Sequence, residues 1–445
     1  MLRTLDARDP GFNTWIAEQS ADSSLFDPEI EKRARTVVEA VMERGDAALV
    51  EFTKRFDGAD VPPHDFAVSA AEYMNAALAA SQELRLAVQA AAKNIERFSR
   101  RSLRRGWTTR NLEGAKVGEK FDPFRRVGIY IPGGTAPLAS TALMTIVLAR
   151  VAGCPEIVVC TPCDSKGRIN PAMLHAIRTA GATEVYRLGG AQAIAAMALG
   201  TSTVRRVDKV FGPGNAYVVA AKRMLFGRVA LDLLPGPSEV LVLADATAPA
   251  RYIAADLLAQ AEHGSGHERC WLVTPSNAQI QAVRSEMIRQ LPDLGRREFI
   301  EKAVRTHGWA IRVDSMEHGV EVANRLAPEH CEIHAKNPSR WAKNLTTSGA
   351  LFLGPYSPTV LGDYVAGPSH TLPTGGAGRS FAGLTVDQFQ RRTSVVEYSA
   401  ASARKAMSAV QIFASMEGLD AHGRSLSIRF ESKRSGSRRA KRARA

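Results

Sequence analysis

The sequence is poor in cysteine and has no long hydrophobic run, and both absences exclude classes of protein. Its 445 residues contain five cysteines, an odd and sparse set that excludes a disulfide framework and suits a reducing compartment. No stretch of about 18 uncharged apolar residues occurs, as a membrane-spanning helix would need. The opening residues carry acids where a signal peptide has an apolar segment. We therefore expect a cytoplasmic globular protein without a membrane partner.

The cysteines include a single CxxC pair, Cys160 and Cys163, directly after the apolar run "EIVV". No tryptophan adjoins the pair and no second CxxC exists. Buried or incidental thiols explain the pair better than a redox or zinc centre, which remains the weaker alternative.

Positive charge is concentrated at the C-terminus. The formal net charge is +13, and seven of these charges lie in the last thirteen residues, which contain no acid, leaving six for the rest of the chain. A low-complexity basic tail of this kind is expected to be disordered and solvating. Weak, salt-dependent contact with polyanions is the alternative, and we expect no specific nucleic-acid partner.

The chain changes character at Arg126. Residues 1–125 are mainly helical in pattern, and we expect them to pack on the second of two α/β domains. From Arg126, short β-branched runs alternate with helical stretches, which is typical of a parallel sheet covered on both faces. The predicted fold is α/β, with two doubly wound, Rossmann-like domains and a small C-terminal helical extension. The expected boundaries are 126–238 and 239–385 for the two domains, 386–430 for a C-terminal segment and 431–445 for the disordered tail.

Several predicted strand-to-helix turns are rich in glycine. They contain Gly133 and Gly134, Gly189 and Gly190, Gly212 and Gly214, and Gly236. In a doubly wound sheet such turns line the crevice where a nucleotide phosphate meets backbone N–H groups. None of them is a G-x-G-x-x-G motif, so turn geometry and helix packing remain equally good explanations.

A set of polar residues in the second half has the composition of a metal site. Gln260 and His263 share one helix face within "LLAQAEHG", and Asp363 and His422 lie near the ends of later elements. Two imidazole nitrogens and two oxygens suit a divalent ion such as zinc, with no thiolate to reduce its Lewis acidity. The alternative is that these are ordinary core or surface residues.

Glu329 and His330 are a candidate acid–base pair. Neighbouring residues of a regular element point in different directions, so both reach one ligand only from an irregular turn, which Pro328 favours. A carboxylate and an imidazole are two bases of different pKa, enough to deprotonate an alcohol and to activate a water. An ordinary helix-end pair is the alternative.

Seven ordered motifs resemble the histidinol dehydrogenase family. They are "RRVGIYIPGGTAPLASTALM", "VDKVFGPGNAYVVAAKR", "PGPSEVLVLAD", "ADLLAQAEHG", "RLAPEHCEI", "GDYVAGPSHTLPTGG" and "LDAH". The resemblance covers about residues 1–430 and leaves only the basic tail outside.

The resemblance implies a role for each matching residue. The positions of the family's zinc ligands are Gln260, His263, Asp363 and His422, one Zn²⁺ per subunit, and its catalytic pair is Glu329 and His330. The positions that contact NAD are Tyr130, Gln192 and Asn215. Substrate contacts fall on Ser238, His370 and Glu417, together with His330 and the four metal ligands.

The resemblance also implies the reaction and the assembly. The family oxidises L-histidinol to L-histidine by way of L-histidinal, with two hydride transfers to NAD, in histidine biosynthesis. It is a homodimer whose C-terminal segment reaches the neighbouring subunit, so Glu417 and His422 are expected to complete the partner's site.

Two departures border the implied substrate pocket. The family often has alanine where Pro235 stands and asparagine where Ser369 stands. A zinc- and NAD-dependent relative acting on another small polar alcohol is therefore the main alternative. A zinc hydrolase with Glu329 as base, and a nucleic-acid-binding protein acting through the tail, are alternatives from other classes.

Overall fold

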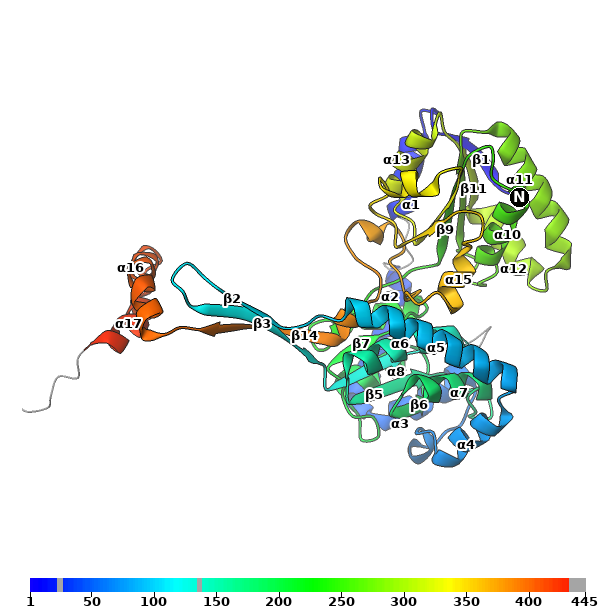
Figure 1. The fold of residues 1–445 in the computed structure, drawn as a ribbon. Coiled ribbons are helices and arrows are strands. Elements are labelled where there is room, and N and C mark those ends of the chain that lie inside the picture. The colour runs from blue at the N-terminus through cyan, green and yellow to red at the C-terminus, as the bar shows by residue number, and fades with distance from the viewer. Residues whose placement is uncertain (22–26, 134–137, 432–445) are drawn as a thin grey trace, which may run out of the picture. The chain divides into compact units, whose positions relative to one another are not determined.

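The computed structural model describes residues 1–21, 27–133 and 138–431, and the chain forms two compact units. The first unit comprises Met1–Leu103 and Pro123–Phe389, and the second comprises Arg104–Asp122 and the chain from Gln390 onward (Figure 1). The expected disordered tail lies outside the described residues except for Glu431. No helix in the described ranges is long and apolar enough to span a membrane.

The first unit contains a five-stranded parallel sheet of order β6-β5-β4-β7-β8. Its strands are β4 (Arg126–Tyr130), β5 (Glu156–Thr161), β6 (Glu184–Arg187), β7 (Lys209–Phe211) and β8 (Ala230–Leu231). The connecting helices are α6 (Ala139–Ala152), α7 (Pro171–Ala180), α8 (Gly190–Leu199) and α9 (Ala216–Leu225). The strand order reverses between β4 and β7, and ligands bind at such a switch point in doubly wound sheets.

A second parallel sheet in the same unit has the order β1-β11-β10-β9-β12-β13. Its strands are β1 (Arg3–Asp6), β9 (Glu239–Ala244), β10 (Arg269–Thr274), β11 (Gly308–Arg312), β12 (His330–His334) and β13 (Ala350–Leu353). Its helices are α10 (Ala250–Ala261), α11 (Asn277–Gln290), α12 (Arg297–His307), α13 (Met316–Leu326), α14 (Pro338–Ala342) and α15 (Thr359–Tyr364). Apart from β1, this sheet has the same strand topology as the first, and its strand order reverses between β9 and β12. The predicted fold class, α/β with two doubly wound domains, is therefore confirmed.

Apolar side chains alternate between the two faces of each sheet. On β12, Cys331 and Ile333 pack with α13, whereas the intervening residues face the side covered by α10. This alternation follows from the two-residue period of a strand. It places every second residue of β12 against α10.

The N-terminal helices pack mainly on the first sheet. They are α1 (Phe12–Ala21), α2 (Pro28–Arg44), α3 (Asp46–Asp57), α4 (Ala70–Ala79) and α5 (Gln82–Ser102). Helices α2 and α3 contact α8, α2 also contacts α9, and α4 and α5 contact α7 and its neighbours (Figure 1). Strand β1 pairs with β11 of the second sheet, and α1 packs on α13. The expectation that this whole region packs on the second domain is therefore wrong, because an amphipathic pattern identifies a buried face without identifying its partner.

The second unit combines segments from two distant parts of the chain. Its three-stranded sheet has the order β14-β3-β2, from β2 (Trp107–Arg110), β3 (Lys116–Pro123) and β14 (Gln390–Glu397). Helices α16 (Ala400–Met416) and α17 (Asp420–Ser427) follow. The second unit also has the 3₁₀ helix Ile428–Phe430, and the described part of the first unit has the 3₁₀ helices Pro63–Asp65, Leu291–Asp293, Ala377–Arg379 and Val386–Phe389.

Candidate functional site

The three residues expected at the cofactor lie around the switch point of the first sheet. Tyr130 is the last residue of β4, and its hydroxyl accepts a hydrogen bond of 3.0 Å from the Gly190 N–H. Asn215 caps α9, because its side chain accepts 3.1 Å hydrogen bonds from the N–H groups of Tyr217 and Val218. Gln192 is fully buried on α8, and its amide atoms have no partner within the described residues.

All three residues line one cleft of about 1540 Å³. Its walls also include Gly133 and Gly190 from the predicted glycine-rich turns. Pockets for drug-sized ligands usually measure about 300 to 1000 Å³, so this cleft has room for a larger, extended ligand. The cleft is therefore the candidate dinucleotide site.

The other glycines of the predicted turns have different positions. A Cβ on Gly212 would lie 2.1 Å from the Tyr130 carbonyl oxygen, so close approach of two strand ends requires glycine there. Gly236 lies in the segment that links β8 of the first sheet to β9 of the second, and its N–H donates to the Thr374 hydroxyl. Gly134 is outside the described residues. The glycine-rich turns predicted from the sequence thus include residues that line the cleft and residues that are needed only for close backbone packing.

A second polar group gathers at the amino ends of β9 and β12. His330 is the first residue of β12, and its Nε2 lies 3.9 Å from Oδ1 of Asp363 on α15. His370 Nδ1 lies 3.9 Å from the same carboxylate oxygen. His263 interacts electrostatically with all three of these residues. The structure thus brings together side chains that are more than 100 positions apart in the sequence.

Backbone carbonyls set the tautomers of all three imidazoles in this group, since Nδ1 of His370 also lies 3.0 Å from the Asp363 carbonyl oxygen. Nδ1 of His330 lies 2.9 Å from the Glu239 carbonyl oxygen, and Nδ1 of His263 lies 3.0 Å from the Gln260 carbonyl oxygen. A carbonyl only accepts, so each Nδ1 carries the proton and each Nε2 keeps a lone pair. His263 and His330 are therefore prepared to act as a ligand or a base through Nε2.

Burial shifts the pKa values of the group. It lowers the pKa of His330 and of His370 to about 4, with His263 adding repulsion, so both imidazoles are neutral at neutral pH. Burial raises the pKa of the Asp363 carboxyl to about 6, opposed by attraction to His263. Neutral imidazoles beside a carboxylate are the protonation states that metal binding requires.

Glu329 and His330 are both buried and lie close together. Glu329 Oε2 is 3.6 Å from His330 Nδ1 and accepts a 2.9 Å hydrogen bond from the Glu239 N–H. Helix α13 ends before them at Ala327, which has a positive φ of 48°. Burial, with repulsion from Glu239 and Asp363, raises the pKa of Glu329 well above its usual value, although a Ser238 hydrogen bond opposes this. The pair thus combines a basic carboxylate with a neutral imidazole.

Two of the four expected metal ligands, His263 and Asp363, interact electrostatically in the structure, and a third, Gln260, lies three residues before His263. Gln260 is buried near the end of α10, and its Nε2 has no hydrogen-bond partner among the described residues. The amide oxygen of Gln260, the Nε2 of His263 and the Asp363 carboxylate together make a nitrogen and oxygen donor set that suits a divalent cation. His263 itself is exposed in the single chain.

Two expected residues lie in the second unit. Glu417 follows α16 and His422 is on α17, and both are exposed. Gln260, His263, Asp363, His330, His370, Glu329 and Ser238 thus all belong to the first unit, whereas Glu417 and His422 belong to the second.

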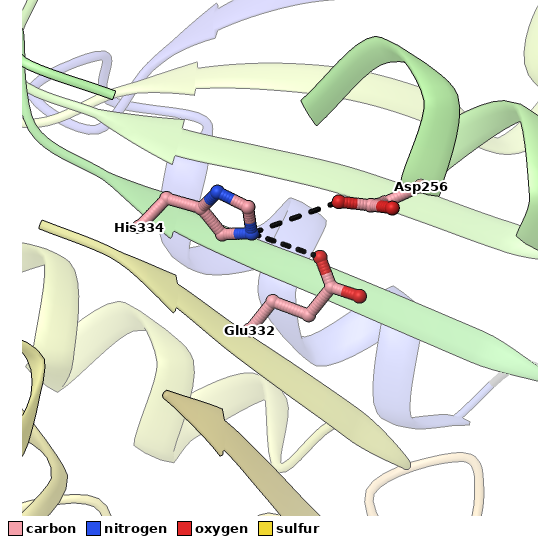
Figure 2. A group of neighbouring side chains, drawn as sticks. All are labelled: Asp256, Glu332 and His334. Carbon is pink, nitrogen blue, oxygen red and sulfur yellow. Dashed lines mark hydrogen bonds and ion pairs between the residues drawn. The ribbon is translucent and has the colours of Figure 1, made fainter. Parts of the chain in front are cut away.

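The sequence analysis missed a buried cluster of Asp256, Glu332 and His334 (Figure 2). His334 Nε2 lies 3.3 Å from Glu332 Oε2 and 3.6 Å from Asp256 Oδ2. The spacing in the sequence could have indicated it. Glu332 and His334 follow His330 at two-residue steps, on the same strand face, and Asp256 precedes Gln260 by about one helical turn, on the same helix face.

Comparison with known proteins gives one consistent result. The family model described as histidinol dehydrogenase matches residues 21–430. A histidinol dehydrogenase of Heliobacterium mobile is 45% identical over 408 residues, which cover 92% of this chain and 95% of that protein. One from Synechococcus is 44% identical over 417 residues, covering 93% and 96%. The crystal structure of histidinol dehydrogenase from Elizabethkingia anophelis is similar with a TM-score of 0.89, at 36% identity and with 96% and 98% coverage.

Proposed function

The chain belongs to the histidinol dehydrogenase family, and from this premise we propose how its own residues oxidise L-histidinol to L-histidine by way of L-histidinal. It is an NAD-linked oxidoreductase of histidine biosynthesis. The observation that carries the residue assignment is the approach of His330 to Asp363 at 3.9 Å, with His263 interacting electrostatically with both.

We assign zinc binding to Gln260, His263 and Asp363, with His422 as the fourth ligand. A bound Zn²⁺ would supply positive charge that holds and orients the amino alcohol, through its imidazole and amino nitrogens as the family resemblance implies. The support is the donor set itself: a lone pair on His263 Nε2, a carboxylate and a free amide, with no thiolate. Ser238, His370 and Glu417 are assigned to the remaining substrate contacts.

His330 is the proposed base for alcohol oxidation. Its Nδ1 proton is held by the Glu239 carbonyl, so Nε2 faces the substrate with a lone pair. His330 takes the hydroxyl proton at Nε2 while the carbon releases a hydride to NAD, and the alcohol becomes an aldehyde. Burial keeps the imidazole neutral, which makes it available for this step at neutral pH.

Glu329 is the proposed base for hydration of the aldehyde. Its raised pKa makes the ionised carboxylate a stronger base toward water than an ordinary glutamate. The resulting hydrate loses a second hydride to a second NAD and a proton to His330, and the product is the carboxylate. His330 returns its first proton to solvent before the second oxidation, so the balance is two NAD⁺ reduced, one water consumed and three protons released per L-histidinol.

NAD is assigned to the cleft lined by Tyr130, Gln192 and Asn215. The N-terminus of α9, capped by Asn215, and the buried amide of Gln192 provide the polar contacts. Replacement Gln192→Leu is expected to raise the KM for NAD about tenfold and leave the KM for L-histidinol unchanged, since one lost buried hydrogen bond is worth about 1.4 kcal/mol. The exposed substitution Gln281→Leu is the control.

A homodimer completes the proposed site. Glu417 and His422 of one protomer reach the partner, through the 386–430 segment. The support is exposed apolar surface on α16: Ile412, Phe413 and Met416 are 63%, 58% and 71% exposed in the single chain. Apolar side chains clustered this way mark interaction surfaces. We place the enzyme in the cytoplasm, where its five free cysteines stay reduced.

The experiment that tests this function is NADH formation from L-histidinol and from a panel of other small polar alcohols. We expect two NADH per L-histidinol and much lower kcat/KM for the other alcohols. A preference for another alcohol would show that L-histidinol is not the substrate, but the protein would still be an NAD-linked alcohol dehydrogenase. Turnover without NAD would refute the dehydrogenase activity itself.

A further inference from the structure

The Asp256, Glu332 and His334 cluster lies on α10 and β12, the elements that also carry Gln260 and His330 of the proposed site (Figure 2). The side chains of Glu332 and His334 are at most 1% exposed, and that of Asp256 is 12% exposed. Glu332 Oε1 accepts two hydrogen bonds of 2.7 Å from Thr359, one from its backbone N–H and one from its hydroxyl. Buried groups with this many mutual contacts hold their elements in one relative position.

Each element that contributes to the cluster also carries a residue of the site. On α10, Asp256 and Gln260 are four residues apart, and on α15, Thr359 and Asp363 are four residues apart. Residues four apart lie on one helix face, separated by about one turn of 5.4 Å. On β12, Glu332 and His330 are two residues apart and share a strand face.

The cluster and the proposed site therefore connect the same three elements, α10, β12 and α15, about one helical turn apart. Glu332 is the central member, since it contacts His334 on its own strand and Thr359 on α15, and it interacts with Asp256 on α10. The same three elements meet again one step higher, at Gln260, His330 and Asp363. A shift of α10 or α15 at the cluster would displace Gln260 or Asp363 by a similar amount.

The protonation of the cluster is consistent with a neutral–charged carboxyl pair. Burial, together with the nearby charge of Glu332 and a hydrogen bond to it, raises the pKa of Asp256 to about 8. The pKa of Glu332 is lowered despite its burial, because His334 and Thr359 donate hydrogen bonds to it. Asp256 thus carries the proton and donates to the Glu332 carboxylate.

We propose that Asp256, Glu332 and His334 form a positioning unit that aligns α10, β12 and α15, so that the zinc ligands Gln260 and Asp363 meet beside His330. This inference rests on the proposed zinc site. Outer residues that orient metal ligands typically contribute 10- to 100-fold to metal affinity. The same three side chains have the composition of a cation site, so a second bound metal ion is the competing outcome.

The test is Zn²⁺ affinity, measured by competition with a chromophoric chelator on the full-length protein after metal removal and reloading, together with zinc per subunit. Glu332→Gln, which keeps the shape and loses the charge, is expected to weaken Zn²⁺ binding by roughly 10- to 100-fold. The exposed Glu321→Gln is the matched control and should bind as the wild type does. The urea midpoint and circular dichroism of each variant report folding separately.

Two milder variants keep the test informative if Glu332→Gln does not fold. Asp256→Asn retains a donor toward Glu332 and is expected to bind Zn²⁺ within about threefold of wild type, since the hydrogen bond survives. Thr359→Val removes one of the two donors and should weaken binding by several-fold to about tenfold, and Thr359→Ser should restore it.

The outcomes separate this proposal from the function on which it rests. A lower urea midpoint with unchanged Zn²⁺ affinity in Glu332→Gln and Thr359→Val would show a merely structural role and overturn the positioning unit alone. Two zinc ions per wild-type subunit, with one lost in Asp256→Asn, would show a second metal site instead. A wild-type protein that binds no zinc would overturn the proposed zinc site and this inference together.

Discussion

The Nε2 atom of His330 lies 3.9 Å from Oδ1 of Asp363, although the two residues belong to different elements of the second sheet domain. The strand β12 begins at His330, and the Nδ1–H of its imidazole donates a hydrogen bond to the Glu239 carbonyl, which leaves Nε2 free to face Asp363. This relationship makes His330 the residue best placed to exchange a proton with a hydroxyl bound near Asp363.

The first prediction concerns His330→Asn, whose amide can still donate to the Glu239 carbonyl. Loss of a general base typically costs about 10² to 10⁴ in rate, so kcat for L-histidinol should fall in this range while zinc content stays unchanged. Steady-state NADH formation and metal analysis check both. The control His64→Gln replaces an exposed histidine and should leave kcat unchanged. A His330→Asn enzyme with wild-type kcat would contradict the assignment.

The second prediction separates the two oxidation steps. In Glu329→Gln the hydration base is lost, so oxidation of L-histidinal should slow by about 10² to 10⁴, and oxidation of L-histidinol to the aldehyde should slow less. Rapid-quench analysis with an aldehyde trap measures the two steps, and trapped L-histidinal should accumulate. Equal slowing of both steps would argue against a separate role for Glu329.

The third prediction is a pH dependence of stability from Asp57. Burial at the end of α3 raises the pKa of this carboxyl to about 6 in the folded chain, above its ordinary value of 3.8. The unfolded chain therefore ionises first, and stability falls as pH rises from about 4 to about 6. Asp57→Asn should be more stable than the wild type at pH 7, and this gain should disappear near pH 4. Urea unfolding between pH 4 and 8 measures the gain, with the exposed Asp9→Asn as control; a pH-independent difference would refute the Asp57 origin.

The fourth prediction concerns the C-terminal segment. A chain ending at Leu419 lacks His422, so its proposed zinc shell is incomplete, and it should lose both zinc and activity. A chain ending at Glu431 removes only the basic tail and should keep both. Zinc retained at full occupancy by the shorter chain would refute the role of His422, and loss of activity in the longer chain would assign a function to the tail.

Much of the fold was predictable from local pattern. The alternation of apolar strands with helices after Arg126 predicted two doubly wound domains, and this is the fold observed. The strands β1, β2, β3, β8, β12 and β14 were not predicted. Segments such as "RTLD" and "WTTR" are short, partly polar and mostly exposed, and so lack the apolar alternation of a buried strand, whereas β12 is buried but has His330, Glu332 and His334 at alternate positions. Their pairing depends on partners far away in the sequence.

The site was predictable only where a known family pattern named its residues. Spacing placed Gln260 and His263 on one helix face, but nothing local linked them to Asp363. Asp256 and Glu332 were not found, because their meeting depends on the register between α10 and β12, which is a property of packing. The partner sheet of α2 to α5 was mistaken for the same reason.

The central claim is that Gln260, His263 and Asp363 hold one zinc ion beside His330, and anomalous diffraction at the zinc edge tests it most directly. The account predicts one anomalous peak per subunit within about 2.0 to 2.3 Å of a ligand atom from each of these three residues, the usual zinc–ligand distances. A peak centred instead among Asp256, Glu332 and His334, or no peak in active crystals, would contradict it.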